Sequence, residues 1–171
     1  EADAAGLARL MVGREVLLRV DKREQAPEPL RLALRGIGLA RRPGVAPLAA
    51  IDLELHAGEI LGLAGVQGNG QRELVEIVTG LRQPDAGTLS LDGERLPPLS
   101  PRRARAAGIR LVPEDRQKSG LLLAMSLREN LILGQEGDPP LSRAGWLRPA
   151  QVDALAQRRI AAYDLRVDSL A

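Results

Sequence analysis

Apolar and polar residues alternate with a period of two over residues 30–34 and again over 51–55. This period predicts two half-buried β-strands. Two continuous apolar runs, residues 60–64 and 109–112, are typical of strands that are covered on both faces. A shorter strand is predicted over 88–91, between turns rich in Asp and Gly. The pattern therefore predicts a sheet whose strands differ in how deeply they are buried.

Helical spacing follows the strands. Apolar residues recur at i, i+3, i+4 and i+7 over 74–81, and one apolar face continues from Val152 to Tyr163 after Pro149. Ser100 followed by Pro101 predicts the start of a short arginine-rich helix. Ser126 and Glu129 match a capping box and predict another helix start. Strands alternating with helices indicate an α/β fold, in which the chain between residues 64 and 71 follows a core strand.

The chain divides into two parts at about residue 29. Residues 1–29 contain a possible strand over 15–20 and a charged, proline-containing stretch over 21–29, which is the composition of a linker. We predict that residues 1–29 are the tail of a preceding domain and that 30–171 form the main domain. Within this domain, the Gly- and Pro-rich stretch over 134–145 is predicted to be a loop.

Composition excludes several kinds of protein. The chain has 171 residues, 44% hydrophobic and 27% charged, with 1% aromatic residues and no Cys. Disulfides and thiolate metal sites are therefore excluded, and His56 is predicted to be an exposed turn residue. A net charge of +2 with interspersed charges and few aromatics argues against nucleic-acid binding. With no apolar run of about 18 residues and no signal sequence, we expect a cytoplasmic location.

The candidate chemistry lies between the apolar run and the first helix. Gly65-Val66-Gln67-Gly68-Asn69-Gly70-Gln71-Arg72 has the glycine spacing of a phosphate-binding loop, G-x-x-x-x-G-K-[ST]. Such a loop binds phosphate mainly through backbone N–H groups and the positive end of the following helix. Glycine permits positive φ where the loop curls and lets phosphate approach the main chain. The alternative is a glycine-rich turn that serves packing alone.

Side chains in this loop depart from the motif. Gln71 stands at the lysine position and Arg72 at the Ser/Thr position, followed by the acidic Glu73. The lysine spans the β and γ phosphates and the hydroxyl binds Mg²⁺ in active sites. Gln71 carries no charge and Arg72 cannot bind Mg²⁺, whereas Glu73 must face away from phosphates or pair with an arginine. We expect weak nucleotide binding through the backbone and inefficient hydrolysis.

Three segments together resemble a known family. Residues 53–81 resemble the start of an ATP-binding cassette, and Gly108-Ile109-Arg110-Leu111-Val112-Pro113-Glu114-Asp115-Arg116 with 126–131 resemble its continuation. The Pro-Glu-Asp-Arg sequence and the degenerate loop are similar to the second cassette in the tandem ATP-binding subunits of simple-sugar and nucleoside importers. Residues 10–16 resemble the closing segment of the first cassette.

The resemblance implies a fold, a cofactor and partners. It implies an α/β, P-loop NTPase-like nucleotide-binding domain of an ABC transporter that binds ATP and Mg²⁺. Gly65 to Glu73 would form the Walker A loop, and Glu114 would stand at the glutamine of the Q-loop. The aromatic residue that stacks on adenine is absent from 40–43. Partners would be transmembrane permease subunits and the other cassette, with the protein peripheral on the inner face of the cell membrane.

The resemblance also implies that the chain is a fragment of a transport ATPase. The signature motif, the strand ending in Asp-Glu and the switch histidine of the family are not found before Ala171. We therefore expect the end of one cassette and the first part of a second, which has no ATPase activity in isolation. One alternative is a module that docks on the membrane subunit and holds nucleotide without turnover. Another is an unrelated P-loop protein, such as a kinase or GTPase.

Overall fold

A computed structural model describes residues 10, 11, 28–165 and 167. The predicted strand over 15–20 and all of the predicted linker over 21–29 except residues 28 and 29 lie outside the described residues. The division of the chain at residue 29 therefore stays a prediction. Among the described residues, no helix combines the length and apolar character that crossing a membrane requires.

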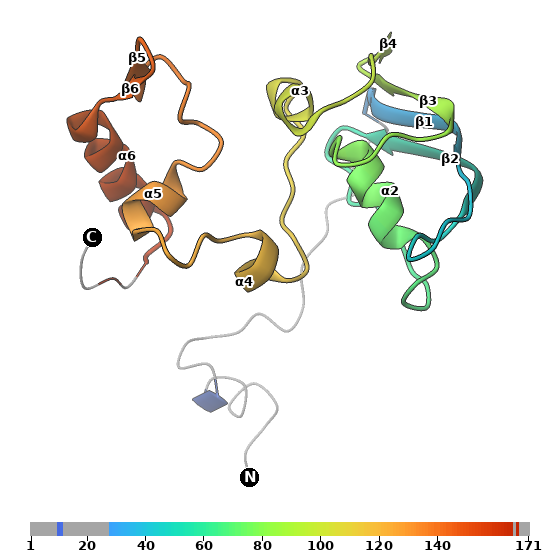
Figure 1. Cartoon of the computed structure of the whole chain (residues 1–171), viewed down its shortest axis with the longest axis horizontal. Helices are drawn as coiled ribbons and strands as arrows, with labels where there is room; N and C mark the ends of the chain where they lie inside the picture. The colour runs from blue at the N-terminus through green and yellow to red at the C-terminus, as the bar shows by residue number, and fades with distance from the viewer. Residues whose placement is uncertain (1–9, 12–27, 166, 168–171) are drawn as a thin grey trace.

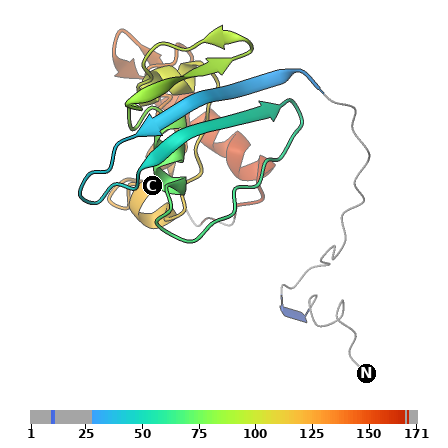
Figure 2. The same ribbon diagram turned by 90° about the vertical axis from the view of Figure 1, so that its right-hand side faces the viewer.

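The first half of the described chain forms an antiparallel sheet (Figures 1 and 2). Strand β1 (Leu30–Leu39) lies between β2 (Leu48–His56) and β3 (Ala86–Leu91), and β4 (Glu94–Arg95) pairs with β3 at the edge. All three pairings are antiparallel. The strands predicted over 30–34, 51–55 and 88–91 are confirmed, and β1 and β2 extend further than the alternating pattern indicated.

Helix α2 (Gln71–Val78) packs on one face of this sheet. Leu74 and Ile77 are buried as the helical spacing predicted, whereas Val78 is half-buried and Leu81, beyond the end of the helix, is 59% exposed. The sheet and the helix bury aliphatic side chains, as the near absence of aromatic residues requires. The buried members of this core are Leu34, Ile37, Leu39, Leu48, Leu74, Ile77, Leu89, Leu99 and Ala104.

A close approach of two strands explains the glycine at position 87. Gly87 has φ 91°, and a Cβ atom there would lie 2.5 Å from the carbonyl oxygen of Gly36 and 2.6 Å from that of Arg35. A side chain at this position would therefore separate β3 from β1. The glycine in the predicted turn serves the sheet as well as the turn.

The strands predicted over 60–64 and 109–112 are not formed, and both predictions are wrong for this structure. Ile60 is 97% exposed and Val112 is 84% exposed. An extended segment becomes a strand only when a neighbour satisfies its backbone N–H and C=O groups. Within 28–165, the sheets contain only β1 to β4 and β5 to β6, and none of these pairs with either segment.

Short helices follow the sheet. Helix α3 (Pro101–Ala106) begins at Ser100, whose side chain accepts a hydrogen bond from the Arg103 N–H, as predicted. Helix α4 (Arg116–Ser119) is capped by Asp115, and α5 (Leu127–Leu131) begins with the predicted capping box. Figure 1 shows α4 within the chain that connects α3 to α5.

The last elements form a second, smaller core. Helix α6 (Pro149–Ala162) packs near α5, and its Val152 is buried with Ile132 and Leu141. The predicted loop over 134–145 contains the first strand of a short hairpin, β5 (Ser142–Arg143) with β6 (Trp146–Leu147). The ion pair Arg128–Asp153, at 3.1 Å, joins α5 to α6.

Candidate functional site

Two glycines of the glycine loop have the backbone conformation that the sequence predicted, whereas Gly65 does not have a positive φ. Gly68 and Gly70 have φ of 91° and 97°, a region that L side chains rarely adopt. The Asn69 N–H donates to the Val66 carbonyl at 3.2 Å, which tightens the loop. Helix α2 then begins at Gln71, with Gly70 as its N-cap. The predicted helix start directly after the loop is confirmed, whereas the predicted strand before it is absent.

Gly70 also fixes the loop against the sheet. A Cβ atom at Gly70 would lie 2.5 Å from Leu48 Cδ2, at the start of β2. The loop therefore rests on Leu48, the first residue of β2, and a larger residue at position 70 would force the loop or the Leu48 side chain to shift. This contact sets where the N-terminal end of α2 lies relative to the β1–β2 connection.

The side chain of Gln71 folds back over the glycine loop. Its Nε2 donates a hydrogen bond to the Val66 carbonyl at 3.3 Å, and a Cβ atom on Gly65 would overlap its amide group. At the lysine position of the motif, the side chain therefore ends in a neutral amide. A phosphate that entered the loop would have to displace this hydrogen bond without gaining a positive charge at position 71.

Glu73 turns away from the glycine loop. Its side chain is buried, with 7% of the residue exposed, and Oε1 accepts a hydrogen bond from the Ala46 N–H at 3.0 Å. That hydrogen bond holds the pKa of Glu73 below its usual value, against the opposing effect of burial. The sequence left open whether Glu73 faces phosphate. In the structure, the Glu73 side chain faces the β1–β2 loop.

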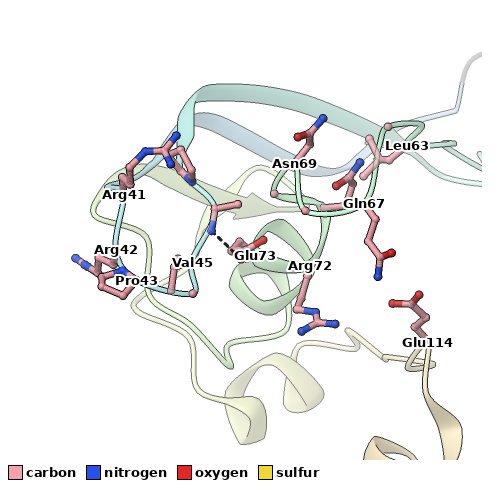
Figure 3. Close-up of a pocket in the computed structure, with 17 residues that line it drawn as sticks. Arg41, Arg42, Pro43, Val45, Leu63, Gln67, Asn69, Arg72, Glu73 and Glu114 are labelled. Atoms are coloured by element: carbon pink, nitrogen blue, oxygen red, sulfur yellow. Dashed lines mark hydrogen bonds between the residues drawn. The ribbon is translucent and has the colours of Figure 1, made fainter.

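One cavity of about 1270 Å³ joins the glycine loop to two other segments (Figure 3). It is lined by Arg41, Arg42, Pro43, Gly44, Val45, Ala46, Pro47, Leu63, Gly65, Gln67, Gly68, Asn69, Gly70, Gln71, Arg72, Glu73 and Glu114. The structure thus brings Glu114, the predicted Q-loop residue, to the same cavity as the glycine loop. Val66 does not line the cavity, and its side chain is 75% exposed.

Sequence reasoning missed the β1–β2 loop as part of this site. We name residues 40–47 the arginine loop, because it contains Arg41 and Arg42. Figure 3 shows both arginines on the side of the cavity opposite Glu114. Two adjacent arginines followed by Pro and Gly between predicted strands were the available signal. The family resemblance points to this segment only through the adenine-stacking aromatic residue, which is absent from 40–43.

Asp85 fixes the position of Arg42. Its carboxylate accepts the Ala40 N–H at 2.8 Å and pairs with Arg42 Nη2 at 2.6 Å. The Ala40 bond, followed by the bond from Arg42, lowers the pKa of Asp85. Arg41 and Arg72 also line the cavity, and neither forms an ion pair with a described residue.

The lining residues fit the phosphates of a nucleotide better than they fit Mg²⁺. Backbone amides of the glycine loop and three guanidinium groups favour an anion. Two carboxylates line the cavity, and that of Glu73 is engaged by Ala46. Among the described residues, no group of three or more metal-binding side chains gathers. Glu114 is left as the one carboxylate of the lining that could face a cation there.

Comparisons with known proteins find a matching family and several similar proteins. Residues 48–168 match the family described as ABC transporter. The guanosine import ATP-binding protein NupO of Bacillus subtilis is 42% identical over 160 residues, which cover 94% of this chain and 31% of NupO.

Two further relatives show a similar degree of likeness. The nucleoside import ATP-binding protein NupA of Lactococcus lactis is 34% identical over 94% of this chain and 32% of NupA. The ribose import ATP-binding protein RbsA of Chromobacterium violaceum is 40% identical over 95% of this chain and 32% of RbsA. The chain therefore spans about a third of the length of these relatives.

Proposed function

This chain belongs to the ABC transporter family, and on that premise we propose that it is part of the ATP-binding subunit of an importer for a nucleoside or a simple sugar. The family match confirms the resemblance read from residues 53–81 and 108–131, together with the predicted fold class. The observation that carries the proposal is one cavity lined by both the Walker A-like loop and Glu114. The names of NupO and NupA favour a nucleoside.

This cassette binds ATP weakly and does not hydrolyse it efficiently on its own. Gln71 and Arg72 lack the charge and the hydroxyl that the motif supplies, and Gln71 bonds to the Val66 carbonyl instead. A charge-assisted hydrogen bond contributes about 1.5–3 kcal/mol and a neutral one about 1. The difference of about 0.5–2 kcal/mol corresponds to roughly twofold to thirtyfold weaker binding.

A direct test restores the motif. In the full-length gene product that carries these residues, the double substitution Gln71→Lys with Arg72→Ser should tighten Mg²⁺-dependent ATP binding roughly tenfold to thirtyfold, because it returns the missing charge and hydroxyl. Equilibrium titration with ATP, with and without Mg²⁺, measures the change. Tight Mg²⁺-dependent binding by the natural sequence would contradict the proposal. The isolated 171-residue chain should show no ATPase activity.

The proposed membrane partner lies against residues 114–130. This segment carries Leu121, Leu122, Leu123 and Met125, all of which are exposed, Leu123 at 74%. Exposed apolar side chains in one segment are a common mark of a protein interface. We place the transmembrane permease there, with the protein peripheral on the inner face of the membrane. Crosslinks from positions in this segment to the permease should form, and crosslinking confined to the opposite face would refute this placement.

The other cassette of the same chain is the second proposed partner. In that arrangement residues 1–29 are the end of the preceding cassette, and the degenerate loop forms the weaker of two ATP sites. The alternative is a docking module that holds nucleotide without turnover. If substitution of the Walker A lysine in the other cassette abolished uptake while changes at residues 65–73 left uptake intact, the docking module would be favoured.

A further inference from the structure

Glu73 is an acidic residue in the first turn of α2. In a phosphate-binding loop, the N-terminal end of this helix faces the phosphates. The burial of Glu73 and its hydrogen bond to Ala46 turn this carboxylate sideways, toward the arginine loop. An ionised carboxylate that accepts a backbone N–H forms a charge-assisted bond, which is stronger than a neutral one. The first turn of α2 therefore contacts two segments. It follows directly on Gly70 of the glycine loop, and through Glu73 it binds the arginine loop.

The arginine loop is held at its other end as well. Asp85 accepts the Ala40 N–H at 2.8 Å and pairs with Arg42. The loop closes on itself through the Val45 N–H, which donates to the Arg42 carbonyl at 3.0 Å. Two carboxylates outside the loop thus anchor its beginning and its end, and Arg41 lies between the anchors.

The charge of Arg41 is available to a ligand. It lines the cavity shared with the glycine loop and pairs with no carboxylate within the described part of the chain. Gln71 brings no charge to that cavity. A guanidinium binds phosphate oxygens and also stacks on planar rings, so Arg41 suits either end of a nucleotide.

We propose that Glu73 is a positioning residue that couples the arginine loop to the glycine loop, and that Arg41, held in this way, binds a nucleoside polyphosphate in the shared cavity. This inference rests on the proposed nucleotide-binding function. It assigns to this cassette a source of positive charge on the β1–β2 loop in place of the lysine missing at position 71. Glu73 itself does not touch the ligand.

Hydrogen exchange followed by mass spectrometry tests the proposal in the full-length gene product, with ADP and ATPγS as probes. In the natural sequence, nucleotide should slow exchange in peptides covering 40–47 and 65–73. Without nucleotide, Glu73→Ala should speed hydrogen exchange over 40–47. With nucleotide, this variant should no longer show slower exchange over 40–47. Glu73→Gln should keep most of the nucleotide-induced slowing of exchange over 40–47, because the amide oxygen still accepts the Ala46 N–H.

The matched control is Glu76→Ala on the same helix. Glu76 pairs with Arg82 at 2.8 Å and does not line the cavity. This substitution removes a carboxylate of α2 without touching the arginine loop, so exchange over 40–47 should stay as in the natural sequence. Thermal melting of each variant shows whether it folds, and Arg41→Ala, at an exposed position, keeps the test valid if Glu73→Ala does not fold.

A double-substitution cycle separates positioning from general stability. Arg41→Ala should weaken nucleotide binding at this site roughly tenfold, as expected for the loss of one charge-assisted bond. In the Glu73→Ala background, Arg41→Ala should weaken nucleotide binding less than twofold, because the arginine is no longer held in place. Equal effects in both backgrounds would overturn the inference.

Two outcomes distinguish this inference from the proposed function. If nucleotide slows exchange over 65–73 but Glu73→Ala and Arg41→Ala change nothing, the cassette binds nucleotide and the inference is wrong. If nucleotide leaves both peptides unchanged in the natural sequence, the proposed nucleotide site is wrong, and the ligand role of Arg41 is overturned with it.

Discussion

The antiparallel sheet and the two apolar segments over 60–64 and 109–112 are built from similar residues and have different structures. Strands β1 and β2 pair with each other and bury side chains such as Ile37, which is fully buried. Ile60, of the same residue type, is 97% exposed. The difference teaches that apolar residues allow a segment to form a strand. The segment becomes a strand only when a neighbouring strand pairs with its backbone.

Sequence distance explains which segments found a neighbour. Strands β1 and β2 are joined by a short loop, so their pairing closes little chain, and β3 adds to the same strand after one helix. A strand buried on both faces needs partners on both sides, usually through crossover connections. Within the described residues neither 60–64 nor 109–112 has such a partner.

Replacing isoleucine by alanine at positions 37 and 60 tests the comparison between the sheet and residues 60–64 most strongly. Ile37→Ala should reduce the free energy of unfolding by about 2–5 kcal/mol, because it leaves a cavity in the packed core. Ile60→Ala should change it by less than about 0.5 kcal/mol, because its side chain contacts mainly water. Urea unfolding of the 171-residue chain, followed by circular dichroism, measures both. Equal costs would show that residues 60–64 are packed in solution.

A smaller effect is expected from the close contact between β1 and β3. Gly87→Ala should cost about 1–3 kcal/mol, because φ is 91° and the new Cβ would meet the backbone of Gly36. Gly93→Ala is the matched control, with φ 82° and no atom within 4 Å of the new Cβ. Thermal melting should show the larger loss for Gly87→Ala. An equal loss would mean that only backbone strain, and no interstrand contact, acts at Gly87.

The smallest expected effect concerns acid. The pKa of Glu73 is lowered by the Ala46 N–H, and that of Glu129 by the hydroxyl and the N–H of Ser126. A lowered folded-state pKa stabilises the fold above the unfolded-state value, and this contribution is lost as pH falls through the folded-state value. Glu73→Gln should therefore flatten the acid side of the stability curve more than Glu129→Gln, whose carboxylate is exposed. Melting temperatures between neutral and acidic pH measure this, and the reverse order would contradict it.

The helices show how much local signals can predict. The capping box at Ser126 and Glu129 and the N-cap at Ser100 both form as predicted. Their hydrogen bonds join residues three positions apart, so no distant segment is required. Helix α2 likewise begins where the glycine loop ends. The same local reasoning failed at 142–147, where a short hairpin replaces part of a predicted loop.

The candidate site was predicted in part. Residues 65–73 were identified from their spacing and Glu114 from a family resemblance, and all except Val66 line one cavity. The direction of the Glu73 side chain and the presence of Arg41 in the lining of the same cavity were not predicted. The direction of Glu73 depends on the Ala46 N–H, which is 27 residues away in the sequence.

The sequence by itself determined the glycine loop, the helix starts, the alternating strands and the family, because each of these depends on residue type and on neighbours within a few positions. Only the tertiary structure decided which apolar segments became strands and which charged side chains share the cavity with the loop. The physical reason is that strand pairing and the Glu73–Ala46 and Asp85–Arg42 contacts join residues far apart in the chain. Spacing along the sequence does not state which distant groups will satisfy each other.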